Sequence, residues 1–269
     1  MIKLAANLSM LFQDRPFLDR FDAAADAGFR GVEYLFPYEA PAKIIADKLR
    51  ARDLTQVLFN TPAGDWAAGE RGLGALPGRV EEFRDGVQRA LEYARALGCK
   101  KLHTMAGIPP SSVDPAEADR IFSENVAYAA RAAAEHGIEI LLEPINSRID
   151  MPGYFLNRSR QAVAIIEHLG LPNVRLQFDI YHMQIMEGDL ARSMQTLKAH
   201  IAHVQVADNP GRNEPGTGEI NYPWLLHHLD SIGYAGWVGC EYRPKGDTVA
   251  GLGWAKDYFE SKSAERAVG

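Results

Sequence analysis

Four residues with oxygen donors stand at the ends of apolar segments in the second half of the sequence. They are Glu143 in ILLEPIN, Asp179 in LQFDIYH, Gln205 in AHVQVAD and Glu241 in VGCEYRP. Carboxylate and amide oxygens suit a cation such as Mg²⁺ or Mn²⁺, and the lack of a thiolate disfavours a structural zinc site. Buried carboxylates need a cation, a proton or hydrogen-bond donors. The set therefore predicts a divalent metal site, although each residue alone would be an ordinary strand-end acid or cap.

Two long irregular stretches, residues 62–78 and 209–223, carry side chains that could contact a substrate. These are Trp66, Glu70 and Arg71 in the first stretch and Arg212 in the second. The planar guanidinium group suits a substrate carboxylate better than lysine does. We expect Arg212 to make this contact, with Arg71 as the second candidate and Glu70 orienting it. The alternative is that both arginines form loop salt bridges or helix caps.

His182 lies three residues beyond Asp179, past the predicted strand end, where a neutral imidazole could reach a substrate oxygen. The alternative is an ordinary surface histidine. Side chains alternate between the two faces of a strand, so Gln177 shares a face with Asp179, and His203 shares one with Gln205. This alternation predicts a polar network in the interior of the fold, below the metal site.

Eight apolar segments of strand length alternate with helix-like segments along the chain. The strand candidates begin at Ile2, Gly31, Leu54, Lys100, Ile138, Val174, Ile201 and Gly236. Amphipathic segments between them, such as residues 17–28, 80–98 and 124–137, each finish with a glycine suited to follow a helix. Strict alternation implies a parallel sheet.

Eight strand–helix units in 269 residues favour one closed (β/α)8 barrel, the TIM barrel, spanning residues 1–269 as a single domain. Such a barrel would bring the four oxygen-donor residues together at the carboxyl ends of adjacent strands. An open, doubly wound sheet is the alternative. It is disfavoured because no G-x-G-x-x-G motif follows the first strand segment.

Composition excludes several classes of partner. The net charge of −6 and the absence of a Lys/Arg-rich run disfavour nucleic acid and favour a small-molecule substrate. Cys99 and Cys240 are far apart, which predicts no disulfide framework and suits a reducing compartment. No apolar run of about 18 residues indicates a membrane span, and the first residues lack a basic region. We predict a cytoplasmic protein, and the sequence permits a homo-oligomer.

Several longer strings resemble the hydroxypyruvate isomerase family, which includes 2-oxo-tetronate isomerases, within the xylose-isomerase-like barrels. They are PAGDWAAGERG, LPGRVEEFRDGV, LEYARALG, LLEPIN, QFDIYHMQ, HVQVADNPGRNEPGTGEINY and GCEYRP. The resemblance extends nearly from end to end. It implies that the four oxygen-donor residues bind the metal, that Glu143 and Glu241 transfer the proton, and that His182 and Arg212 bind the substrate.

The reaction implied by this resemblance interconverts hydroxypyruvate and tartronate semialdehyde through an enediol. Such a reaction needs a base, an acid and stabilisation of an oxyanion, tasks that a metal and two carboxylates can share. A four-carbon 2-oxo-tetronate is an alternative substrate, because one extra hydroxymethylene changes pocket fit only modestly. The prediction is therefore a metal-dependent isomerase of a small hydroxy-carbonyl acid.

Other functions fit the residues less well. A ketose 3-epimerase is disfavoured because related epimerases have histidine where this chain has Gln205. A polyol dehydratase would give no reason for arginines that bind carboxylates. An endonuclease of the apurinic-site class would need a histidine-rich multi-zinc site and a basic face. A non-catalytic sugar-acid binding protein on a degenerate barrel would be expected to lose Glu143 or Glu241, and both are present.

Overall fold

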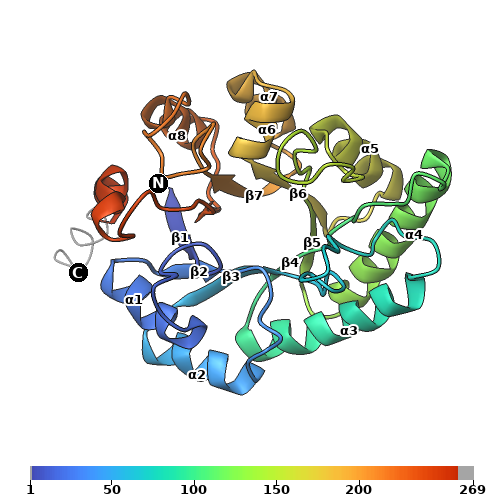
Figure 1. Ribbon diagram of the computed structural model, residues 1–269, viewed down its shortest axis with the longest axis horizontal. Helices are drawn as coiled ribbons and strands as arrows, with labels where there is room; N and C mark the ends of the chain where they lie inside the picture. Colours follow the sequence, from blue (N-terminus) through green and yellow to red (C-terminus); the bar gives the residue numbers. More distant parts are fainter. Residues whose placement is uncertain (1, 260–269) are drawn as a thin grey trace.

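The structure is a computed structural model that describes residues 2–259, and its centre is a closed barrel of parallel strands (Figure 1). The strands are β1 (Lys3–Asn7), β2 (Gly31–Glu33), β3 (Thr55–Asn60), β4 (Lys101–His103), β5 (Glu139–Leu142), β6 (Val174–Asp179), β7 (Ile201–Val206) and β8 (Trp237–Cys240). Each strand pairs with the next one in sequence, and β8 pairs with β1. The predicted (β/α)8 barrel is confirmed, and the alternative of an open sheet is wrong.

Helices form a ring outside the strands (Figure 1). They are α1 (Arg20–Asp26), α2 (Ala42–Ala51), α3 (Val80–Leu97), α4 (Pro115–Ala134), α5 (Ser159–Leu169), α6 (Ile180–Met186), α7 (Leu190–Leu197) and α8 (Tyr222–Ser231), with the short 3-10 helices η1 (Phe17–Asp19) and η2 (Ala250–Ala255). Gly98 follows α3 with φ 67°, and Gly170 follows α5 with φ 59°. Glycine adopts this left-handed conformation without strain, so it ends both helices where a strand must begin soon after.

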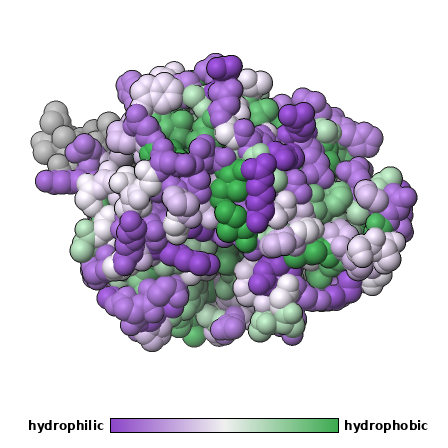
Figure 2. Space-filling model, turned by 45° about the horizontal axis from the view of Figure 1, so that its top comes forward, coloured by the Kyte–Doolittle hydropathy of each residue, from purple (hydrophilic) through white to green (hydrophobic). Residues whose placement is uncertain are grey.

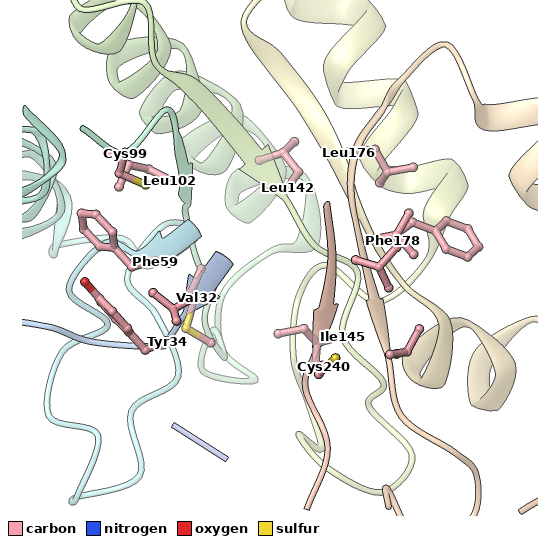
Figure 3. Close-up of a cluster of buried hydrophobic side chains, with 14 of the residues drawn as sticks. Val32, Tyr34, Phe59, Cys99, Leu102, Leu142, Ile145, Leu176, Phe178 and Cys240 are labelled. Carbon is pink, nitrogen blue, oxygen red and sulfur yellow. The ribbon is translucent and has the colours of Figure 1, made fainter. Parts of the chain in front are cut away.

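Alternation along the strands separates an outer apolar layer from the barrel interior. The residues just before the four oxygen-donor residues belong to the large apolar cluster that the strands share with the helices: Leu142, Phe178, Val204 and Cys240. Figure 3 shows Leu142, Phe178 and Cys240 among these buried side chains. Because successive side chains point to opposite faces, the residue that follows each of them points into the barrel.

The outer surface is mainly hydrophilic on the face shown in Figure 2, with apolar side chains confined to small areas. None of the helices within residues 2–259 combines the length and the apolar character needed to cross a membrane.

Candidate active site

The four predicted metal ligands lie together at the carboxyl ends of β5 to β8. Glu143 directly follows β5, Asp179 is the last residue of β6, Gln205 lies near the end of β7, and Glu241 directly follows β8. Asp179 is paired with Gln205 across the sheet. All four side chains are buried. The predicted convergence at the strand ends is confirmed, whereas binding of a metal by the full set stays a prediction.

Two carboxylate oxygens in this cluster have no hydrogen-bond partner within residues 2–259, namely Oε1 of Glu143 and Oδ2 of Asp179. Together with a ring nitrogen of His182, carboxylate oxygens of these two residues form a group whose atoms lie within 4.8 Å of one another. Burial raises the pKa of Glu143 well above its usual value, that of Glu241 to about 8 and that of Asp179 to about 6. A cation would supply the missing partner and keep the carboxylates ionised. The cluster could therefore hold a metal ion.

Gln205 reaches the cluster with the nitrogen end of its amide. Nε2 donates to Oε1 of Glu33 at 2.8 Å and also to Oε2 of Glu241, while Oε1 accepts from Nε2 of Gln177 at 2.7 Å. In this orientation the amide holds Glu241 in place and offers no oxygen to a cation. A role as metal ligand would require the amide to rotate so that its oxygen faces the carboxylates. Gln205 therefore lies at the predicted position, but its amide oxygen points to Gln177 and not to the cluster.

Arg212 supplies a cation in the cluster from the loop after β7. Its Nη2 lies 2.8 Å from Oε1 of Glu241 and 3.9 Å from Oδ2 of Asp179, and its Nη1 lies 3.3 Å from Oδ1 of Asp150. The side chain is buried and carries φ 54°. Its charge is already engaged by three carboxylates. The structure therefore shows Arg212 in the loop salt bridge that the sequence left as the alternative, and its contact with a substrate carboxylate stays a prediction.

The first turn of α6 places the side chain of His182 against the carboxylate cluster. Oδ1 of Asp179 accepts hydrogen bonds from the backbone N–H groups of Tyr181 and His182 at 2.7 and 3.2 Å, which caps the helix. The imidazole Nε2 then lies 3.7 Å from Oε1 of Glu143 and 3.8 Å from Oδ2 of Asp179. Burial lowers the pKa of His182 well below its usual value. The alternative of a surface histidine is wrong.

His103 belongs to the same site and was missed from the sequence. It is the last residue of β4, and its Nδ1 lies 3.3 Å from Oε2 of Glu143. Its Nε2 has no hydrogen-bond partner within the described chain. Burial lowers its pKa to about 3, so the ring is neutral. A polar residue at a strand end was the signal used for the three acids and the amide, and the same signal marks His103.

A polar network lies in the barrel below the carboxylates, as the alternation predicted for Gln177 and His203. Its centre is Glu33 of β2, whose carboxylate accepts from Nδ2 of Asn7 at 3.1 Å and lies 2.7 Å from Nε2 of His203. The same carboxylate accepts from Gln205. Glu33 was missed because β2 is short, so a single acid in it resembles an ordinary strand-end residue. The network connects the first half of the barrel to the carboxylate cluster.

A cavity of about 440 Å³ opens above the cluster. Its lining includes Glu143, His182, Arg212, Glu241 and Arg243 from the ends of β5 to β8, and Asn60, Trp66 and Arg71 from the end of β3 and the loop after it. A larger surface groove of about 820 Å³ runs along α4, between α3 and α5, but it contains none of the strand-end carboxylates. The smaller cavity is therefore the candidate substrate site.

Arg71 and Trp66 form one unit at the rim of this cavity. The guanidinium carbon lies 4.2 Å from the indole centroid, and Nη1 donates to the backbone oxygens of Trp66 and Glu70 at 3.1 and 2.7 Å. No carboxylate within residues 2–259 forms an ion pair with Arg71. The side chain of Glu70 does not orient it, because that carboxylate binds Arg79 at 2.6 Å and lies outside the cavity lining. The expected role of Glu70 is corrected accordingly.

Comparison with known proteins agrees with this geometry. Residues 21–258 match the family model described as the xylose isomerase-like TIM barrel. A 2-oxo-tetronate isomerase from Cupriavidus necator is 54% identical over 96% of this chain and 99% of the relative. A hydroxypyruvate isomerase from Escherichia coli is 48% identical over 96% of this chain and the full length of the relative.

Two solved structures share this fold. A protein from Brucella melitensis named AP endonuclease, family 2, is 52% identical, has a TM-score of 0.94 and is covered over 99% of its chain, against 96% of this one. A 3-keto-D-glucoside 4-epimerase from E. coli has a TM-score of 0.80 at 20% identity, over 96% of this chain and 99% of the epimerase. The second likeness shows the fold alone.

Proposed function

This chain belongs to the xylose isomerase-like TIM-barrel family, and on that premise we propose that it is an isomerase of hydroxypyruvate or of the four-carbon 2-oxo-tetronate. The observation that carries the proposal is the pair of buried glutamates, Glu143 and Glu241, that face one small cavity. Relatives that match over nearly their whole length and bear these two isomerase names support it.

We place a divalent metal at Glu143, Asp179 and Glu241, with Gln205 as the fourth residue after its amide turns over. When bound, such an ion polarises the carbonyl and hydroxyl oxygens of the substrate. Oε1 of Glu143 and Oδ2 of Asp179, which have no hydrogen-bond partner among residues 2–259, support this location. Mg²⁺ and Mn²⁺ are the ions we favour, because the donors are all oxygen atoms.

The two glutamates divide the proton transfer between them. One carboxylate removes a proton from the hydroxymethyl carbon, and the other returns a proton to the neighbouring carbonyl carbon, while the hydroxyl hydrogen passes between the two oxygens. A carboxylate whose pKa is raised by burial is a stronger base than one in water. Arg212 opposes that rise for Glu241 through its charge, and it keeps that side chain aligned at 2.8 Å.

We assign the substrate carboxylate to Arg71. The cluster has more acids than cations, so an anionic substrate is best held at the far side of the cavity, away from Glu143 and Asp179. Arg71 lines that side, forms no ion pair with a carboxylate among residues 2–259, and its guanidinium group lies over the ring of Trp66. Its remaining N–H groups can meet two carboxylate oxygens.

The test is direct comparison of kcat/KM for hydroxypyruvate and 2-oxo-tetronate on purified protein that contains Mg²⁺ or Mn²⁺. We expect clear turnover of at least one acid, loss of turnover with a chelator, and recovery on adding the ion back. Absence of turnover with both acids would contradict the proposal. Turnover that a chelator leaves unchanged would contradict only the metal.

The name of the B. melitensis protein raises the alternative of an abasic-site endonuclease. The net charge of −6 argues against a DNA substrate. Incubation with a duplex that contains one abasic site should leave the strand intact, and metal-dependent cleavage would favour the endonuclease. The cytoplasmic location and any homo-oligomer stay predictions.

A further inference from the structure

Asn146 lies in the loop after β5, fully buried, and uses both ends of its amide. Oδ1 accepts from the backbone N–H groups of Ile149 and Asp150, both at 3.0 Å. Nδ2 donates to Oδ2 of Asp150 at 2.5 Å and lies 2.8 Å from Nδ1 of His182. Neither the metal prediction nor the proton transfer uses this residue.

The orientation of this amide is determined by its other partners. If it turned over, Nδ2 would face two backbone N–H donors, and Oδ1 would face the carboxylate of Asp150. Two donors or two acceptors in contact repel one another and leave buried polar groups unsatisfied, which is costly. Three of the four contacts therefore place Nδ2 against the imidazole of His182.

The proton on His182 follows from this orientation. An N–H group of Asn146 points at Nδ1, so Nδ1 must present its lone pair, and a neutral ring then carries its hydrogen on Nε2. We propose that Asn146 is a positioning residue that holds His182 in the Nε2–H form, so that His182 donates a hydrogen bond to a substrate oxygen and does not bind the metal.

The surroundings of Nε2 fit this role. It lies 3.7 and 3.8 Å from the oxygens of Glu143 and Asp179 that have no hydrogen-bond partner among residues 2–259, and these oxygens can accept its hydrogen. Nη2 of Arg212 faces the same nitrogen at 3.5 Å, the long limit of a hydrogen bond, and is the one donor that competes with this arrangement among the contacts described. His103 has the opposite arrangement, since its Nδ1 faces Glu143 and its partnerless Nε2 is the acceptor. The two neutral histidines would thus offer one donor and one acceptor. The substrate role of His182 rests on the proposed function, whereas its protonation pattern does not.

The protonation pattern can be measured on the wild-type protein by ¹⁵N NMR after labelling histidine. Metal-free and Mg²⁺-loaded protein should both show His182 protonated at Nε2, and His182→Gln identifies its signals by their loss. Protonation at Nδ1 would overturn the proposal. The measurement needs no substrate, so it separates failure of this inference from failure of the proposed isomerase activity.

An exchange of side chains tests the role of Asn146. Asn146→Asp/Asp150→Asn keeps the total charge and a donor–acceptor pair between the two positions, but it turns an acceptor toward Nδ1 of His182. Asp150→Asn alone is the matched control, because it makes the same change beside Arg212 and retains Asn146. Relative to this control, we expect the double variant to show Nδ1–H and a kcat lower by about 100-fold, with KM changed far less.

Cobalt gives a readout that is independent of turnover. In the double variant the lone pair of Nε2 becomes available, so Co²⁺ should acquire a nitrogen ligand and its visible spectrum should differ from that of the control. If the double variant matches the control in kcat and in spectrum, Asn146 does not control His182. Should the double variant fail to fold, Asn146→Ala must still show mixed protonation of His182, and an unchanged Nε2–H form would overturn the proposal.

Discussion

Two loops rich in glycine and proline each bring an arginine to the same cavity, and the two arginines end in different surroundings. Arg212, after β7, is buried against Glu241, Asp179 and Asp150. Arg71, after β3, lies at the rim on Trp66, and no carboxylate in the described part of the chain pairs with it. The comparison shows that an arginine in the cavity pairs with the protein's own carboxylates where these lie within reach. Where none lies within reach, the arginine can bind a carboxylate of the substrate.

The loops themselves explain the difference. Asp208 accepts from the backbone N–H groups of Gly216 and Gly218, both at 2.9 Å, which draws the second loop back onto the end of β7. A side chain at position 218 would collide with the carbonyl oxygen of Asn209, so glycine is required there. The first loop is instead held at the surface by Glu70 and Arg79. The loop after β7 therefore places Arg212 in the buried cluster, whereas the loop after β3 leaves Arg71 at the rim of the cavity.

The largest expected effect comes from Glu241, the acid that Arg212 serves. Glu241→Gln keeps the size of the side chain but removes the base, so kcat should fall at least about 1000-fold. Steady-state isomerisation measures the loss, and an unchanged circular dichroism spectrum shows that the fold persists. Near-normal turnover would remove Glu241 from the proton transfer and would leave Arg212 with no catalytic partner.

Arg212→Ala should lower kcat by about 100-fold and leave KM less affected. Removing one partner of a buried, hydrogen-bonded charge pair leaves the other charge without compensation, which costs about 2–5 kcal/mol. Arg212→Lys should recover part of the activity because it retains the charge. If instead KM rises and kcat is unchanged, Arg212 contacts the substrate carboxylate after all, and the contrast between the two loops fails.

Arg71→Ala should show the opposite pattern, with KM raised about 10-fold or more and kcat changed little. Hydrogen bonds to a charged group contribute about 1.5–3 kcal/mol, and these would be lost in both the bound substrate and the transition state. Arg71→Lys is the control for charge without the planar fork. A drop in kcat at constant KM would place Arg71 in the catalytic step.

Trp66→Ala should have the smallest effect, a rise in KM of about 3-fold. A cation over an exposed aromatic ring is worth about 0.5–1 kcal/mol, and its loss only loosens the guanidinium of Arg71. The double variant with Arg71→Ala should be no worse than Arg71→Ala alone, because both changes act on one contact. Additive effects would show that Trp66 contacts the substrate independently.

Several features could be predicted from sequence because they depend on local periodicity. The alternation of apolar strands with helices predicted the barrel, and the positions of Glu143, Asp179 and Glu241 at strand ends predicted that they would meet. Side-chain alternation likewise predicted that Gln177 and His203 face inward. These features follow from geometry that repeats along the chain, so a single sequence contains them.

Other features depend on partners that are distant in sequence. Asn146 lies against His182 from the next strand–helix unit, and Glu33 reaches Gln205 and His203 across the barrel. No pattern near these residues shows which atoms will meet, because closure of the barrel decides it. The same is true of the direction in which the amide of Gln205 points.

The two arginines mark the boundary between these cases. The sequence by itself determined that Arg212 and Arg71 lie in loops at the active end of a barrel, because both follow predicted strands. Only the tertiary structure decided that Arg212 is neutralised by Glu241 while Arg71 stays available to a substrate. The physical reason is that the state of a charge depends on its neighbours in space, and those neighbours come from other strand–helix units.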